Sequence, residues 1–232
     1  MEKLIFATII LVGVTLISTA SATILGTVDI ENHNNNLSST GQLWSLALGG
    51  ESGGTFYTGV YSWTNNGGTG LGTQVPNWGF CIELPQEPIS GWQDVVSLDV
   101  APMPAQFGTP MGAFKADRIS ELWGRHFDPA WTTGADRPMA QAFSACIWEI
   151  VYETDPIWDV TSGTGFSATG IEQAATANLW LSQLNGDARY FANNLVATST
   201  DGGQDYLVQV PEPATIGLLG LGVLSLLRKR RA

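Results

Sequence analysis

The chain has 232 residues, of which 44% are hydrophobic and only 13% charged, and its formal net charge is −11 at pH 7. Without residues 1–22 and the basic cluster at 228–231, five basic residues stand against 20 acidic ones, a net charge of −15. Such a surface repels nucleic acid phosphates, so no nucleic acid partner is expected. The 27 glycines favour turns and strands over a helical bundle.

The N-terminus has the pattern of a secretion signal. Lys3 precedes an apolar run over residues 4–17, and Ala20 and Ala22 form a small-residue cleavage site. The apolar run is short for a membrane-spanning helix. We therefore expect residues 1–22 to be a signal peptide, recognised by the Sec translocase and cut by signal peptidase after Ala22. The mature protein would then lie outside the inner membrane, where disulfides can form.

The first half of the body is rich in strand-forming residues, separated by clusters of Asn, Gly and Ser. The clusters at 33–36 and 65–68 predict turns. Five strands are expected, over residues 23–29, 42–48, 55–63, 77–83 and 92–98.

The second half shows helical periodicity. One apolar stripe consists of Ile119, Leu122, Trp123, His126 and Phe127. A second helix is expected between Asp136 as N-cap and Pro156 as terminator, and a third over residues 171–184.

The body is expected to end in a hairpin. Its strands cover residues 190–198 and 204–210, around a turn at 201–203. We therefore predict a single α+β domain at residues 23–209. It consists of antiparallel strands, with about three helices inserted before the C-terminal hairpin.

The C-terminal tail combines three features. Pro211-Glu212-Pro213 separates it from the domain, because proline resists regular structure. Residues 214–227 are apolar and would rise about 21 Å as a helix, short of the ~30 Å hydrocarbon core. The tail ends in a basic cluster that favours the cytoplasmic lipid surface, formed by Arg228, Lys229, Arg230 and Arg231. The pattern predicts a short C-terminal transmembrane helix.

These three features together resemble the PEP-CTERM sorting signal of proteins exported by Gram-negative-type bacteria. The resemblance covers residues 210–232. It implies processing by exosortase, a membrane transpeptidase-like enzyme, with cleavage near Pro211-Glu212-Pro213. It further implies transient anchoring in the inner membrane and delivery to the cell surface or the extracellular matrix. A tail anchor that is never cut is the alternative.

Cys81 and Cys146 are the only cysteines. An even pair in an exported protein predicts a disulfide, which would stabilise the fold by about 4 kcal/mol on the chain-entropy model. Two buried free thiols are the alternative.

Residues 80–83 and 144–150 resemble the paired motifs of thioester domains in bacterial surface adhesins. The resemblance implies a bond between the sulfur of Cys81 and the carboxamide carbon of a glutamine on the facing helix. Ser144 stands at the glutamine position and has no carboxamide, while Gln141 lies one turn earlier. We expect the scaffold to be kept and the chemistry lost.

The sequence offers little for catalysis. His33 and His126 are the only histidines, and His126 belongs to an apolar stripe, which predicts a packed side chain. Glu149 and Glu153 form an i,i+4 pair that is suited to a cation or to acid–base chemistry, although a solvated helix face is the favoured interpretation. No phosphate loop, nucleophile elbow or paired-histidine metal motif occurs. We expect no enzymatic activity, no cofactor and no metal.

The aromatic content suggests carbohydrate binding, because sugar rings stack on aromatic faces. Six tryptophans and tyrosines of the strand-rich half could serve this purpose: Trp44, Tyr57, Tyr61, Trp63, Trp78 and Trp92. Core packing is the alternative for aromatic residues in strands. We predict a non-catalytic surface or matrix protein with a structural or adhesive role in exopolysaccharide or biofilm. A thioester-type adhesin and a glycan-binding module are the alternatives.

Overall fold

The computed structural model of the chain describes residues 23–36, 44–48, 51–56, 58–102, 110–154 and 157–212. The predicted signal peptide, with Ala20 and Ala22, lies outside the described residues. The predicted C-terminal helix and its basic cluster lie outside them as well. No helix in the described part of the chain is long and apolar enough to cross a membrane.

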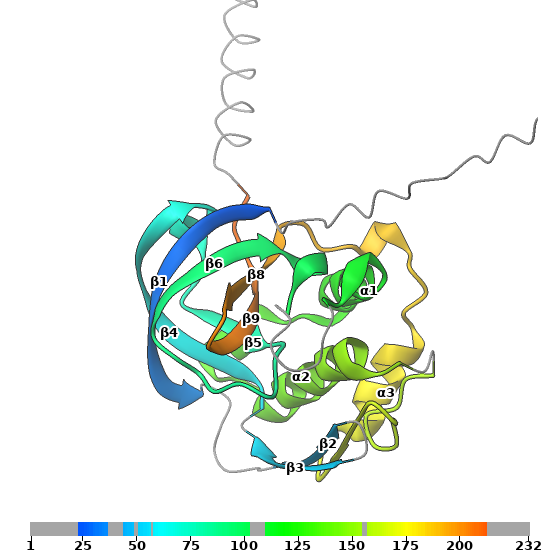
Figure 1. Ribbon diagram of the computed structural model, residues 1–232. Helices are drawn as coiled ribbons and strands as arrows, with labels where there is room; N and C mark the ends of the chain where they lie inside the picture. The colour runs from blue at the N-terminus through cyan, green and yellow to red at the C-terminus, as the bar shows by residue number, and fades with distance from the viewer. Residues whose placement is uncertain are drawn as a thin grey trace, which may run out of the picture.

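Six antiparallel strands close into a barrel in the order β1-β4-β5-β9-β8-β6 (Figure 1). Closure pairs both edges of every strand. The barrel strands are β1 (Ile24–Asn36), β4 (Val60–Gly70), β5 (Trp78–Cys81), β6 (Gly91–Ser97), β8 (Leu195–Thr200) and β9 (Gly203–Gln209).

Aromatic side chains fill the barrel interior. The Tyr206 ring lies 4.9 Å from the ring of Trp63 and 5.5 Å from that of Tyr61. Its hydroxyl accepts a hydrogen bond from Asn32 on β1, a strand that does not pair with β9. Cys81 is the cross-strand partner of Tyr206, so it faces the same interior.

Three helices cover one side of the barrel, namely α1 (Gly112–His126), α2 (Arg137–Tyr152) and α3 (Ala174–Ser182) (Figure 1). A second antiparallel sheet, in the order β3-β2-β7, lies beyond α2. Its strands are β2 (Trp44–Leu48), β3 (Glu51–Phe56) and β7 (Phe166–Thr169). Four short 3-10 helices complete the described elements, over Leu71–Gln74, Leu98–Val100, Pro129–Thr133 and Ala188–Tyr190.

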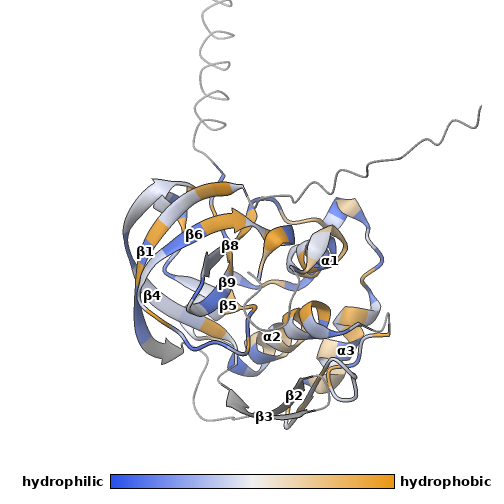
Figure 2. Cartoon of the chain, viewed as in Figure 1, coloured by the Kyte–Doolittle hydropathy of each residue, from blue (hydrophilic) through white to orange (hydrophobic). Residues whose placement is uncertain are grey.

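Helix α2 is the centre of the fold. It contacts both β4 of the barrel and β7 of the small sheet, and every residue from 140 to 151 is buried. A helix covered on all sides is expected to be apolar on more than one face. Figure 2 shows hydrophobic residues along α2 and along β6.

The α+β prediction is confirmed, with three helices before the C-terminal β8–β9 hairpin. One expected strand and two expected turns are wrong. The strand expected over 55–63 divides into β3 and β4, the turn expected at 33–36 lies inside β1, and the turn expected at 65–68 lies inside β4. There, a bulge shifts the pairing with β1, and Asn65 Nδ2 donates to the carbonyls of Gly72 and Val75.

Candidate functional sites

The last barrel strand leads directly into the tail. Gln209, the final residue of β9, accepts a hydrogen bond from Trp123 Nε1 (3.1 Å) and donates one to the Asn193 carbonyl (3.1 Å). Val210 N donates to the Asn194 carbonyl at 3.0 Å. Val210 is buried, whereas Pro211 is exposed.

Within the described part of the chain, Val210 is therefore the last residue that is buried and hydrogen-bonded to the domain, and the Pro-Glu-Pro segment begins at the next residue. Glu212 is exposed like Pro211, while Pro213 lies outside the described residues. A cut after Pro211 or further along leaves every described barrel contact in place.

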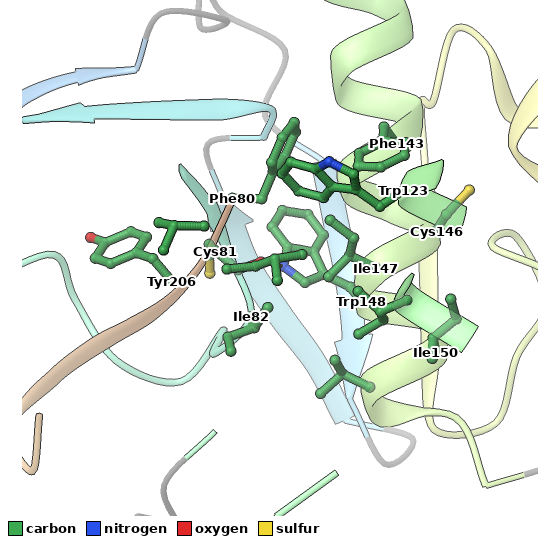
Figure 3. Close-up of a cluster of buried hydrophobic side chains, with 14 of the residues drawn as sticks. Phe80, Cys81, Ile82, Trp123, Phe143, Cys146, Ile147, Trp148, Ile150 and Tyr206 are labelled. Atoms are coloured by element: carbon green, nitrogen blue, oxygen red, sulfur yellow. The ribbon is translucent and has the colours of Figure 1, made fainter. Parts of the chain in front are cut away.

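The two cysteines do not meet. Cys81 Sγ donates to the Glu83 carbonyl at 3.4 Å, and Cys146 Sγ donates to the Ala177 carbonyl of α3 at 3.4 Å. Both are buried free thiols, and Figure 3 shows their sulfur atoms pointing in different directions. The predicted disulfide is wrong, because the alternation of β5 turns Phe80 toward the helices and Cys81 into the barrel.

Burial raises the pKa of both thiols above the ordinary value. Each therefore stays protonated at neutral pH, in the form that is a poor nucleophile.

Strand β5 and helix α2 are joined by a hydrogen bond to the backbone of Cys81, whose thiol faces the barrel interior. Trp148 Nε1 on α2 donates to the Cys81 carbonyl on β5 at 2.8 Å. Ser144, at the glutamine position, instead accepts from Gly59 N (2.9 Å) and donates to the Gly59 carbonyl (3.1 Å). Gln141 is also buried on α2, one turn earlier. The hydroxyl of Ser144 thus holds the start of β4, and the Cys81 thiol has a different partner.

Glu149 and Glu153 are both buried, so the interpretation as a solvated helix face is wrong. The loop after α2 folds back over them. Glu149 Oε1 accepts from Asp159 N at 2.8 Å, and Glu153 Oε2 accepts from Gly165 N at 2.8 Å. A Cβ at Gly163 would lie 2.5 Å from Glu153 Oε2, so the loop needs glycine there to approach this closely.

This arrangement makes Glu149 and Glu153 acceptors for a loop. Glu149 Oε2 accepts no hydrogen bond from the described residues. Burial, together with the charges of Glu153 and Asp159, raises the pKa of Glu149 to about 7. The described residues hold no cluster of three or more metal-ligating side chains.

Replacing Glu149 by glutamine should stabilise the protein at pH 8 and leave its stability nearly unchanged at pH 4.5. The raised pKa means that the favourable contribution of Glu149 is complete below pH 4.5 and is lost as the pH rises to about 7. Glutamine stays neutral throughout. Urea unfolding at both pH values measures the difference, with the exposed Glu172→Gln as control. A difference that does not change with pH would contradict this assignment.

His126 is packed as predicted, and His33 lies in β1. His126 stacks on the Trp180 ring, with centroids 5.1 Å apart, and burial lowers its pKa. The exposed His33 pairs with the Thr64 hydroxyl at 2.7 Å.

Tyr57 and the side chain of Trp44 lie outside the described part of the chain, and the other four aromatic residues divide into two groups. Tyr61 and Trp63 are buried in the barrel, and Trp78 stacks on Trp123, so all three have packing roles. Trp92 on β6 is 64% exposed. Sequence reasoning did not separate it from the others, because exposure depends on which strand face turns outward.

Residues 209–231 match the family model of the PEP-CTERM protein-sorting motif. The match begins at the last residue of β9 and extends through the tail, as the sequence pattern predicted. Neither the comparison with curated proteins nor that with solved structures found a match.

Proposed function

The chain carries a PEP-CTERM sorting signal, which marks an exported protein processed by exosortase, and from this premise we propose that its barrel domain is non-catalytic cargo for the cell surface or the extracellular matrix. In this proposal the Sec translocase exports the chain and signal peptidase removes residues 1–22. Residues 214–227 then hold it transiently in the inner membrane until exosortase cuts near Pro211.

The observation that carries the proposal is the junction between fold and signal. Gln209 and Val210 are fixed by hydrogen bonds to Trp123, Asn193 and Asn194. The motif follows without a linker, so its removal costs the domain none of these contacts. Processing can therefore release a completely folded body.

The non-catalytic role is supported by how the chemically active groups are used. The thiols are buried with raised pKa values, and the carboxylates of Glu149 and Glu153 hold a loop. These are structural uses of residues that a catalytic site would leave accessible to substrate. We propose a structural or adhesive role in an exopolysaccharide matrix.

Replacing both Pro211 and Glu212 by alanine should abolish correct processing in cells that contain exosortase. The wild-type chain is expected at the surface or in the medium, with a mass that ends near the motif. The double variant should keep its tail and fractionate with the inner membrane. Intact-protein mass spectrometry of each cell fraction measures both properties.

Glu172→Ala supplies the matched control, because it removes an exposed acidic side chain outside the signal. It should be processed like the wild type. A double variant with the same mass and distribution as the wild type would contradict the sorting proposal.

A further inference from the structure

The outer face of the barrel presents one tryptophan beside a small acidic cavity. Along β6, the side chains of Trp92 and Asp94 face outward. Those of Gln93 and Val95, the residues that follow each of them, are buried. A cavity of about 210 Å³ is lined by Trp92, Asp94, Ser199, Thr200 and Asp201. It is smaller than the roughly 300–1,000 Å³ of drug-sized pockets, so it suits one ring of a ligand.

Ser199 is the observation that points to a ligand. It lies opposite Asp94 in the β6–β8 register, so the two side chains share the outer face. Ser199 is only 3% exposed, yet its Oγ forms no hydrogen bond within the described part of the chain. An unpaired buried hydroxyl is costly, and each such group calls for an explanation.

A bulge in the pairing of β8 with β9 determines the position of the Ser199 hydroxyl. Thr198 pairs with Tyr206 and Thr200 with Gly203, so Ser199 lies at a shift in register. The Asp205 carboxylate accepts from Thr200 N at 3.2 Å and holds the turn beside the cavity. Bulges commonly re-aim side chains next to functional sites.

The side chains that line the cavity indicate which class of ligand it would bind. The Trp92 indole offers a flat apolar face, and the carboxylates and hydroxyls of the other lining residues accept hydrogen bonds. A pyranose ring matches both properties, because its C–H face is apolar and its rim carries hydroxyl donors. Asp94 and Asp201, together with Asp29 opposite Trp92 on β1, repel anionic ligands.

We propose that Trp92, Asp94 and Ser199 form a binding site for one ring of a neutral polysaccharide. The sugar ring stacks on Trp92, and its hydroxyls donate to Asp94 and pair with Ser199. This inference rests on the proposed function, because such a site would attach a surface or matrix protein to polysaccharide.

Calorimetric titration of the full chain in detergent tests the site. The probes are three neutral oligosaccharides, namely cellohexaose, maltohexaose and mannohexaose, with hexagalacturonate as the acidic counterpart. We expect at least one neutral probe to bind and the acidic one to bind more weakly. Trp92→Ala should weaken binding about tenfold, a change of 1.4 kcal/mol in binding free energy.

Two further variants make the test specific. Ser199→Ala should weaken binding severalfold without lowering resistance to urea, because the hydroxyl has no partner within the described chain. Phe114→Ala removes another exposed aromatic side chain, 62% exposed on α1, and should bind like the wild type.

The inference is overturned if none of the three neutral probes binds, if Trp92→Ala binds as tightly as Phe114→Ala, or if the acidic probe binds best. A chain that binds sugar but is never processed contradicts the sorting proposal alone. One that is processed and exported but binds no probe contradicts this site alone.

Discussion

Replacing Trp148 by alanine should lower the free energy of unfolding by about 3–5 kcal/mol, the range found when a buried aromatic residue is truncated. Trp148 is fully buried in α2, and its ring lies 6.1 Å from that of Phe166 on β7. Its Nε1 donates to the Cys81 carbonyl on β5. One side chain thus joins the central helix to both sheets, and urea unfolding followed by circular dichroism measures its contribution.

Two other variants separate the causes. Trp148→Phe keeps most of the apolar volume but leaves the Cys81 carbonyl without the indole donor, so we expect a loss of about 1–2 kcal/mol. Trp92→Ala removes an exposed indole and should cost less than about 0.5 kcal/mol. If Trp148→Ala and Trp92→Ala unfold at the same urea concentration, the central role of Trp148 is wrong.

The sequence predicted the helices better than the sheets, and α2 shows why. Asp136 and Pro156 predicted its two ends. Its polar residues Ser144 and Glu149 are buried as well, because Gly59 at the start of β4 and the loop after α2 pack against them. Strand β7, which also contacts α2, is held by pairing with β2, which lies far away in sequence. Local patterns do not contain this information.

The barrel explains the other errors. The Asn-Gly cluster at 65–68 resembles a hairpin turn, yet it lies in β4, where the backbone of β1 approaches closely. A Cβ at Gly68 would clash with the Thr27 carbonyl. Glycine is therefore needed there so that the backbones of β1 and β4 can approach closely. The disulfide prediction failed for a related reason, since cysteine spacing does not show which strand face Cys81 occupies.

The sorting signal was predictable because it is read from linear sequence and needs no partner from elsewhere in the fold. Trp92 and Ser199 differ in this respect. They are separated by more than a hundred residues and come together only through the β6–β8 pairing. Their shared cavity follows from strand order, which the composition of either segment does not reveal.

Replacing Glu121 by alanine should cost about 3 kcal/mol, because a buried carboxylate that organises several donors would be lost. Glu121 is fully buried in α1. It accepts from Arg125 Nε (2.9 Å) and Nη2 (2.8 Å), and from Gly186 N at 2.7 Å. The charge therefore ties α1 to the segment that follows α3.

The effect should be local as well as global. Hydrogen exchange at the Gly186 amide should accelerate in Glu121→Ala more than exchange in the barrel strands, because that amide loses its acceptor. Glu121→Gln keeps the shape and one acceptor oxygen, so its cost in urea unfolding should be smaller. The exposed Glu172→Ala removes the same charge without these contacts and should cost under about 0.5 kcal/mol. Equal costs for Glu121→Ala and Glu172→Ala would mean that the buried charge does not hold the two segments together.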